Sequence, residues 1–499
     1  MSAVDNKKCS YIKKNKKISF TFDGKKYSGY KGDTIASALL RNNVRLIARS
    51  FKYHRPRGIY TCGIEEPNAI VQILNEHNEP NTRATVKQIY EGMKVDSQNR
   101  WPSLNLDIGS INNLLSPMFS AGFYYKTFMG PKGFWKNIYE PLIRRTAGLG
   151  KPPKNFRSKS IHQNHNVDIV IIGGGLSGLI CARKLIDSDQ EVLLIEQDSF
   201  LGGILKNSNK IKSIEGKKAI DWINETEELI KKCKNIKILK NTLANTYNFT
   251  NHLIALEDKF PGKKIDTNKS ELTLHKIRTT HTILANGHIE RIISFRNNDL
   301  PGVMLASSFE KYIHRYGVVP EERPVIFTNN SSTISLVKSL VSLKCKPIAY
   351  IDSRKEENIQ KEIKEYLKIN NIKFYPESEV EGCDGNKKVE NINIRSLKSL
   401  SVVNSSMLCV SGGYNPDIHL FTQSKGLLKW DDEIISFKPD TPFQNTITLG
   451  SVSGNFNFKE LVSEIDKKIS FITNKKYNPA FELNVSENFS ISELWETKT

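Results

Sequence analysis

Three glycines and one acidic residue indicate the clearest chemistry in this sequence. Gly173, Gly175 and Gly178 stand at the G-x-G-x-x-G spacing. An apolar run, Ile169 to Ile172, precedes them, and Glu196 ends a second such run 18 residues after the last glycine. Glycines so placed allow a tight turn, close approach of a pyrophosphate to the backbone, and close packing of a helix on a strand. The acid can accept hydrogen bonds from ribose hydroxyls, so the pattern predicts a dinucleotide-binding βαβ unit.

The alternative interpretation of these glycines is a turn that only packs against its neighbours. Against it, apolar residues recur at helical spacing from Leu179 to Ile186, and a second strand is predicted at Val192–Ile195, so every part of the unit is in register. The acid favours a free 2′-hydroxyl, and therefore NAD or FAD over NADP. The spacing does not separate NAD from FAD.

Two segments that follow the acid are expected at the same crevice. The pair Gly202-Gly203 would let the backbone lie close to a cofactor, although an ordinary loop explains such a pair equally well. Ile236–Leu243 is predicted to be a strand whose backbone near Leu243 flanks an adenine.

Two later strands are also expected to end at this crevice. Thr280–Gly287 is predicted to be an apolar strand that closes on Asn286 and Gly287. Thr446–Leu449 is predicted to lead through a small-residue turn, Gly450 to Gly454, into a helix from Phe456 to Ile472. Such a turn offers amide donors to an anion.

A second βαβ pattern runs from Pro324 to Asp352, but its turn reads TNNSS and contains no glycine. Asparagine tolerates left-handed backbone angles, so the turn can form. Side chains in it would obstruct a pyrophosphate, and we interpret this half as a structural relic of a nucleotide domain. The predicted fold class is α/β, with two dinucleotide-binding, Rossmann-like domains of the FAD/NAD(P)-binding type.

The N-terminal segment predicts a β-grasp, ferredoxin-like domain. A hairpin over Ile18–Tyr30 turns at Asp23-Gly24, and a short helix follows at Ile35–Arg41. Such a domain can carry an iron–sulfur cluster in the next loop, residues 49–63. This loop holds one cysteine, Cys62, where a cluster needs four. We therefore expect a domain that lacks the cluster.

The same loop is strongly basic, and its cations are Arg49, Lys52, His54, Arg55 and Arg57. They form either a solvated loop or a docking point for an anionic ligand or partner surface, and the sequence leaves both open. Residues 101–165 are rich in aromatic side chains, which favours a domain or subunit interface over a substrate pocket. These aromatic residues are Phe119, Phe123, Tyr124, Tyr125, Phe128, Phe134, Trp135 and Tyr139, and a linker from Lys151 to Asn166 follows them.

Composition excludes several classes of function. The net charge is +20, but the lysines are scattered without aromatic interleaving, which favours a solvated surface over nucleic-acid binding. The seven dispersed cysteines, none at zinc-ligand spacing, suit a reducing cytoplasm and predict no metal site. No signal peptide or membrane helix is expected. No Ser/His/Asp set or redox cysteine pair is found, so no catalytic residue is assigned.

The predicted domain order follows from these segments. It is a ferredoxin-like domain (1–100), an aromatic connecting segment (101–165), a dinucleotide-binding domain (166–302 and 411–475), an inserted degenerate domain (303–410) and a tail (476–499).

Long stretches of this chain resemble the α subunit of heterotetrameric sarcosine oxidase, a flavoenzyme complex. The matching stretches include GDTIASALLRNNVRLIARSFKYHRPRG, SQNRWPSL, the glycine fingerprint, DLPGVMLA and VSGGYNPDIHLFTQSKGLLKWD. Known α subunits continue into a folate-binding, aminomethyltransferase-like half, which is absent from this sequence. The resemblance therefore leaves room for a separately encoded folate-binding chain.

The resemblance implies an NAD-holding subunit of a cytoplasmic complex with β, γ and δ partners. The family oxidises sarcosine to glycine, transfers the methyl carbon to tetrahydrofolate or releases it as formaldehyde, and forms hydrogen peroxide. FAD and FMN are then expected elsewhere in the complex. Alternatives are a subunit of a related amino-acid or opine oxidase or dehydrogenase, or a self-standing NAD(P)H-dependent flavin reductase. By resemblance the cofactor residues are Gly173, Gly175, Ser177, Gly178, Glu196, Gln197, Asp198, Gly203, Ile204, Leu243 and Ser451 to Phe456.

Overall fold

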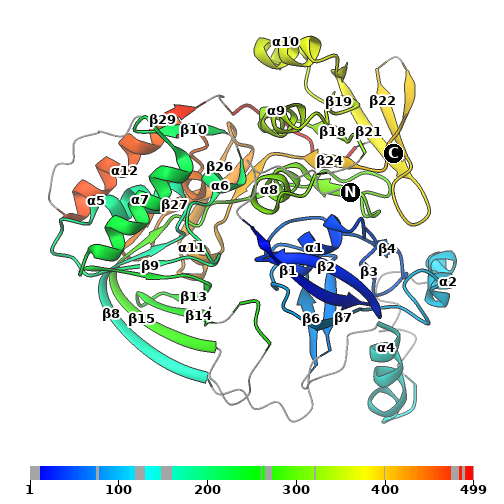
Figure 1. Cartoon of the computed structure of the whole chain (residues 1–499), viewed down its shortest axis with the longest axis horizontal. Coiled ribbons are helices and arrows are strands. Elements are labelled where there is room, and N and C mark those ends of the chain that lie inside the picture. The colour runs from blue at the N-terminus through cyan, green and yellow to red at the C-terminus, as the bar shows by residue number, and fades with distance from the viewer. Residues whose placement is uncertain are drawn as a thin grey trace.

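A computed structural model gives the structure of the chain (Figure 1). It describes residues 12–74, 78–118, 130–147, 160–208, 210–259, 261–264, 272–319, 322–397, 399–473, 483–485 and 489–497. Cys9 and five of the eight predicted interface aromatics, Phe119, Phe123, Tyr124, Tyr125 and Phe128, lie outside these ranges.

The N-terminal sheet has the strand order β2-β1-β7-β5-β6. Its hairpin turns at Asp23 and Gly24, both at positive φ (48° and 76°), which confirms the predicted turn. Helix α1 spans Ile35–Arg41 as predicted, and Thr34 and Ser37 form a capping box at its start. The strands are β1 (Lys13–Phe22), β2 (Lys25–Lys31), β5 (Ile70–Ile73), β6 (Glu79–Arg83) and β7 (Met93–Ser97), with a separate pair, β3 (Ala48–Arg49) and β4 (Pro56–Arg57).

The second sheet carries the glycine fingerprint. Its order is β12-β9-β8-β15-β14-β13, with β28 beside β15, and β12, β9, β8, β15 and β28 run parallel. Helices α5 (Leu176–Lys184), α7 (Ala219–Lys232) and α12 (Phe458–Thr473) cover one face (Figure 1), where they share a core cluster with alternate residues of β8 and β9. The strands are β8 (Ser160–Ile172), β9 (Val192–Ile195), β12 (Ile236–Leu239), β13 (Thr242–Asn248), β14 (His252–Asp258), β15 (Leu272–Leu284) and β28 (Thr446–Thr448).

Two predictions for this sheet were wrong in detail. The linker was expected to reach Asn166, but β8 begins at Ser160 because its polar first half pairs with β15 along the whole length of both strands. Ile236–Leu243 was expected to be one strand, but Asn241 takes a left-handed conformation (φ 52°) and divides it into β12 and β13.

The inserted sheet is all parallel, in the order β17-β24-β18-β19-β20. Together with the fingerprint sheet and the N-terminal domain, it confirms the predicted fold class. Helix α8 (Ala306–Tyr316) lies between the three sheets in Figure 1, and α9 (Ile334–Ser342) packs beside it. Other elements here are β17 (Val303–Leu305), β18 (Val325–Thr328), β19 (Ala349–Asp352), β20 (Lys373–Tyr375), β24 (Leu408–Ser411), α10 (Lys361–Ile369) and the meander β21 (Ser378–Asp384), β22 (Asn391–Ser396) and β23 (Leu400–Asn404).

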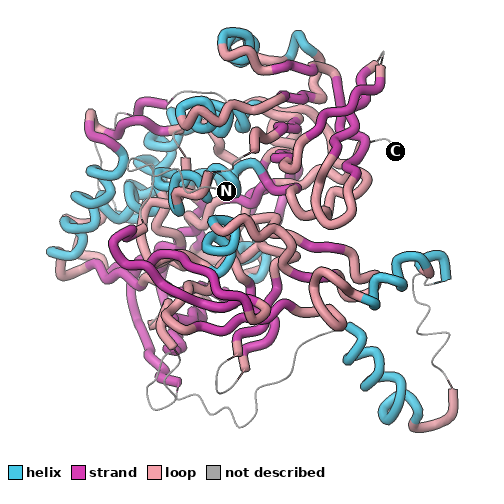
Figure 2. The backbone as a smooth tube through the Cα atoms, turned by 45° about the vertical axis from the view of Figure 1, so that its right-hand side comes forward, coloured by secondary structure: helices cyan, strands magenta, loops and turns pink. Residues whose placement is uncertain are grey.

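Smaller elements join the two nucleotide-type sheets. They are α6 (Ile204–Asn207), β10 (Ile211–Ile214), β11 (Lys217–Lys218), β16 (His288–Glu290), β25 (Tyr414–Pro416), α11 (His419–Gln423), β26 (Leu427–Asp431), β27 (Ser436–Thr441) and β29 (Leu483–Val485). Helices α2 (Ile111–Leu114) and α4 (Glu140–Ala147) project from the body as an arm (Figure 2).

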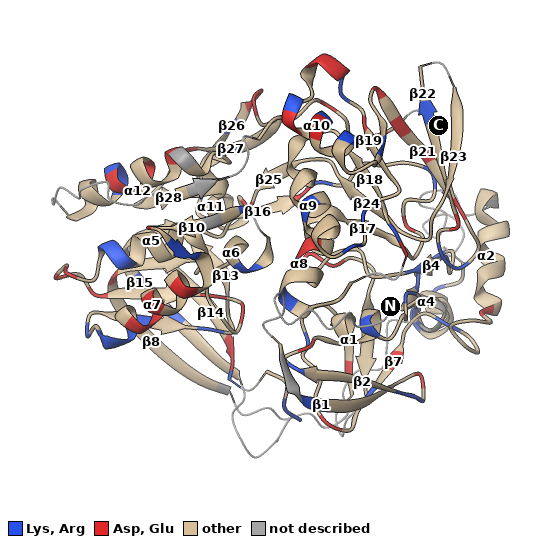
Figure 3. Ribbon diagram, turned by 45° about the horizontal axis from the view of Figure 1, so that its top comes forward, with Lys and Arg blue, Asp and Glu red and all other residues tan. Residues whose placement is uncertain are grey.

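Two features of the whole chain bear on the function classes. Lys and Arg are spread over all parts of the molecule and intermixed with Asp and Glu (Figure 3). No helix among the described residues combines the length and apolarity needed to cross a membrane.

Candidate dinucleotide site

The fingerprint turn between β8 and α5 requires glycine at two positions. Gly173 has φ 104°, and a Cβ there would lie 2.3 Å from the carbonyl oxygen of Ala285. A Cβ on Gly178 would lie 1.9 Å from the carbonyl oxygen of Gly173, so the helix packs directly on the turn. These are the tight-turn and close-packing roles of the motif.

The middle glycine serves another purpose, because a Cβ at Gly175 would meet only the Cα of Gly203, at 4.0 Å. Gly203 has φ 48° and begins α6 at Ile204. Gly175 and Gly203 therefore face each other without side chains at the start of α5. Among the described residues, no side chain caps this helix, so its first amides are available to an anion. This cradle fits the pyrophosphate of a dinucleotide.

The acid at the end of β9 is held by the turn itself. Glu196 Oε2 accepts from the amide of Gly174 (2.8 Å), and Oε1 accepts from the amide of Asp198 (2.8 Å). Burial and the neighbouring Asp198 raise the pKa of Glu196 to about 7. Each oxygen keeps a lone pair for a ribose hydroxyl. The next residue, Gln197, is exposed.

Asp198 links this end of the site to the inserted domain. Its Oδ2 lies 2.9 Å from Nη1 of Arg315 on α8, and the guanidinium lies over the ring of Phe200, 4.1 Å from its centroid. This arginine and Lys311 hold the pKa of Asp198 below its usual range against the effect of burial. The acidic end is thus a junction between two domains, which the spacing of the motif did not predict.

The far wall of the crevice comes from the ends of β15 and β28. Gly287 (φ 92°) would place a Cβ 4.0 Å from Ser451 Oγ. A Cβ at Gly450 would lie 2.3 Å from Oγ of Ser177, so α5 and the last-strand turn touch. Asn286 donates through Nδ2 to the carbonyl of Asp417 (2.8 Å). The structure thus brings these predicted residues to one place, together with Gly454, which ends the turn at φ 84°.

Leu243 was predicted to stand at the adenine. It lies in β13 opposite Leu256, and it follows Thr242, whose amide binds Glu196. The two residues before it bind the acidic end of β9: Thr242 N donates to the carbonyl of Glu196 (2.9 Å) and Asn241 N to that of Asp198 (3.0 Å). The position of Leu243 at an adenine therefore stays a prediction.

A small aromatic pocket of about 40 Å³ lies at the start of α6, and the sequence did not predict it. The ring of Tyr414 lies 4.2 Å from His288 and 5.7 Å from both Phe456 and Phe489, measured between centroids. Lys210 Nζ donates to the Tyr414 hydroxyl (3.1 Å). The pocket also contacts Ile204 and the second turn. Its ring side chains suit a planar ligand, and Lys210, Ser331 and Ser332 add polar groups to the lining.

The imidazole of His288 gives this pocket a testable pH dependence. Burial, with the Lys210 charge nearby, lowers its pKa to about 3, whereas an unfolded histidine titrates near about 6.5. Between these values only the unfolded chain binds the proton, so the free energy of unfolding falls as pH falls. We expect His288→Gln to remove up to about 1 kcal/mol per pH unit of this dependence. Urea unfolding of both proteins between about pH 4.5 and 7 measures it, and equal slopes would contradict it.

The second turn, residues 329–332, is occupied by the chain itself. Asn330 Oδ1 accepts from the amide of Ser332 (3.0 Å), and the amide of Ser331 donates to the carbonyl of Ser490 (2.9 Å). The acid at the end of β19, Asp352, pairs with Arg354. The second turn and Asp352 thus both bind groups of the chain itself, which supports the interpretation of the inserted domain as a structural relic of a nucleotide domain.

The basic loop also binds within the chain. Arg49 donates to the carbonyl of Leu104 (2.8 Å), and His54 Nδ1 lies 2.7 Å from Asp107 Oδ2. Two more of its arginines, Arg55 and Arg57, pair with Asp299, which lies just before the inserted domain. The loop therefore docks on acidic groups of the same polypeptide.

These features define a class: a two-domain dinucleotide-binding oxidoreductase with a ferredoxin-like domain at its N-terminus. Residues 167–441 match the pyridine nucleotide-disulphide oxidoreductase family, and the chain belongs to that family. Residues 15–100 match the 2Fe-2S iron-sulfur cluster binding domain. The family indicates a flavin or nicotinamide dinucleotide as cofactor.

The resemblance to sarcosine oxidase is confirmed. The chain is 37% identical over 448 residues to sarcosine oxidase subunit alpha of Rhizobium meliloti (strain 1021), covering 88% of this chain and 44% of that protein. It is 28% identical to the same subunit of Corynebacterium sp. (strain U-96), covering 89% and 42%. The chain thus spans less than half the length of these relatives. A solved structure of L-proline dehydrogenase from P. horikoshii shares the fold (TM-score 0.57, 21% identity), covering 88% of this chain and 69% of that one.

Proposed function

We propose that this chain is the NAD-holding, α-type subunit of a sarcosine oxidase complex. The complex oxidises sarcosine to glycine, transfers the methyl carbon to tetrahydrofolate or releases it as formaldehyde, and forms hydrogen peroxide. In this proposal the amine is oxidised on a partner subunit. The observation that carries the proposal is the 37% identity to a sarcosine oxidase α subunit along 88% of the chain.

The fingerprint crevice supports a held dinucleotide. Gly175 and Gly203 leave room for the pyrophosphate, and Glu196 stands where a ribose hydroxyl would donate. An acid there favours NAD over NADP, because it repels a 2′-phosphate. The aromatic pocket beyond Ile204 would receive the nicotinamide end. When bound, NAD supplies hydride acceptance; the residues of this chain orient it and exclude water from it.

The projecting arm supports assembly with partners. Leu114 is 80% exposed and Leu142 58%; Ile111 on α2, and Trp135 and Ile138 in the helical turn Trp135–Tyr139 that leads into α4, are exposed by about half. Exposed apolar side chains in a projecting segment are typical of contact sites for other proteins. The proposed partners are β, γ and δ subunits.

Two measurements test the proposal. Denaturing the purified chain should release one NAD per chain, identified by absorbance and mass; release of FAD or NADP would overturn the assignment of the nucleotide. Co-expression with the β, γ and δ partners should give a stable complex that forms peroxide with sarcosine, while the isolated chain shows no turnover. A complex that oxidises proline or an opine but not sarcosine would contradict the substrate.

A further inference from the structure

The loop between β4 and β5 stands where a ferredoxin carries its cluster. Plant-type clusters are held by four cysteine thiolates at the spacing C-x₄-C-x₂-C, with the fourth further along the chain. Residues 15–100 match that domain family but contain a single cysteine, Cys62. Burial raises the pKa of this thiol to about 11, so it is not a thiolate. The residues present do not fit a cluster.

A buried carboxylate lies at the centre of this loop. Glu66 is 1% exposed, and its two oxygens accept five hydrogen bonds from the surrounding loop. Oε2 accepts from the amides of Tyr60 (3.0 Å) and Thr61 (2.6 Å) and from the Thr61 hydroxyl (3.1 Å). Oε1 accepts from the amides of Asn68 (2.8 Å) and Ala69 (2.9 Å). Donors surround the carboxylate as amides surround the sulfurs of a cluster.

The spacing of this network has the register of a cluster loop. Four residues separate Thr61 from Glu66 and two separate Glu66 from Ala69, which is the C-x₄-C-x₂-C spacing. Cys62 comes one residue after Thr61 and occupies none of these three positions. We take Thr85, which follows β6, as the fourth position because its segment is bonded to the loop. Its hydroxyl donates to the carbonyl of Gly63 (2.6 Å), and the adjacent Ala84 donates to the carbonyl of Ala69 (2.9 Å).

We propose that the Glu66 carboxylate replaces an iron–sulfur cluster, with Thr61, Glu66, Ala69 and Thr85 at the former ligand positions. The Glu66 carboxylate supplies the negative charge that a cluster would bring. The loop amides donate to this carboxylate as they would to the sulfurs of a cluster. Electron transfer is lost, because none of these four side chains is a thiolate.

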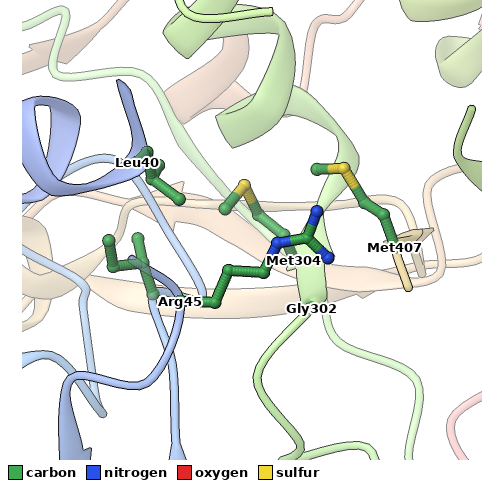
Figure 4. A pocket seen from close by; sticks show the side chains of 6 residues that line it. Leu40, Arg45, Gly302, Met304 and Met407 are labelled. Carbon is green, nitrogen blue, oxygen red and sulfur yellow. The ribbon is translucent and has the colours of Figure 1, made fainter. Parts of the chain in front are cut away.

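The loop so ordered serves as a docking surface for the inserted domain. The carbonyl of Tyr60 accepts from the amide of Leu305 (2.9 Å), and the carbonyl of Thr61 accepts from the Tyr312 hydroxyl (2.9 Å). Nearby, Arg45 Nη1 donates to the carbonyl of Ser406 (2.7 Å). Figure 4 shows this arginine beside Leu40, Met304 and Met407 at the apolar cavity where the two domains meet. The former redox loop thus fixes one domain to the other.

Restoring the thiolates tests the register. The full chain carrying Thr61→Cys, Glu66→Cys, Ala69→Cys and Thr85→Cys is incubated anaerobically with ferrous iron and sulfide. We expect about two iron atoms per chain and the visible absorption of a [2Fe–2S] centre. The control replaces Glu65, the exposed neighbour, instead of Glu66, and should bind no cluster. Cluster binding by the control or by the unmodified chain, or none in a folded fourfold variant, would overturn the proposal.

A second comparison does not depend on the fourfold variant. Glu66→Gln keeps the shape of the side chain but turns one acceptor into a donor that faces amides. Loss of charge-assisted bonds should speed hydrogen exchange at Thr61, Asn68 and Ala69 about tenfold or more, whereas Glu65→Gln should leave it unchanged. Unchanged exchange at these amides in Glu66→Gln would show that the carboxylate does not order the loop.

Discussion

Gly175→Ala is expected to weaken nucleotide binding and leave the chain folded, whereas Gly178→Ala is expected to damage the fold. The reason is where each new Cβ would stand. At Gly175 the backbone angles (φ −75°, ψ −166°) suit any residue, and the Cβ would meet only Gly203, at 4.0 Å. At Gly178 it would stand 1.9 Å from a carbonyl oxygen that the turn cannot move.

The expected magnitudes separate the two variants. Alanine at the helix start costs about 1 kcal/mol or less, so Gly175→Ala should unfold close to the unmodified chain. Its methyl group would occupy the space of the pyrophosphate, and nucleotide affinity should fall at least about tenfold, or about 1.4 kcal/mol. Gly178→Ala should lose about 3 kcal/mol or more of stability, as forced overpacking does.

Urea unfolding and the nucleotide content of the purified chains measure these effects together. The two variants control for each other, since both add one methyl group to the same motif. Retention of full nucleotide content by Gly175→Ala would show that the crevice is not the binding site. Native stability of Gly178→Ala would contradict the packing described for the turn.

Local signals in the sequence predicted the elements that depend on local physics. The Asp23-Gly24 turn, helix Ile35–Arg41 and strand Val192–Ile195 have the predicted bounds, because turn residues, a capping box and a continuous apolar run act within a few residues. The glycine motif belongs to this group. Its spacing encodes contacts between residues five positions apart, from Gly173 to Gly178.

Long-range pairing explains what the sequence did not predict. Residues 160–166 are polar and resemble a linker, and they form a strand only because β15 offers a partner along its full length. His165, in this segment, lies 2.9 Å from Nδ1 of His275 on that partner strand. Similarly, Lys210, Tyr414 and Phe489 come from three distant segments, and only the fold assembles them into a pocket.

Arg354, two residues beyond the second βαβ unit, is expected to be among the most sensitive residues of the inserted domain. Arg354 binds Asp352 through Nε (2.9 Å) and Nη2 (2.7 Å), and both side chains are almost fully buried. Its Nη1 donates to the hydroxyl of Ser490 (2.8 Å), which holds the C-terminal segment over the second turn. Arg354→Met would leave a buried carboxylate without its partner. We expect a loss of about 3–5 kcal/mol.

The double variant Asp352→Asn/Arg354→Met should recover much of this loss, because no uncompensated charge remains. Ser490→Ala, which removes only the contact with the C-terminal segment, should cost about 1 kcal/mol. The free energies of unfolding of the three variants complete the comparison, and limited proteolysis reports whether the segment leaves the turn. A double variant as unstable as Arg354→Met would mean that lost packing, and not the isolated charge, sets the cost. The second turn does not accommodate a pyrophosphate, so the ion pair with Arg354 is the physical reason for an acid at the end of β19. That result would remove this reason.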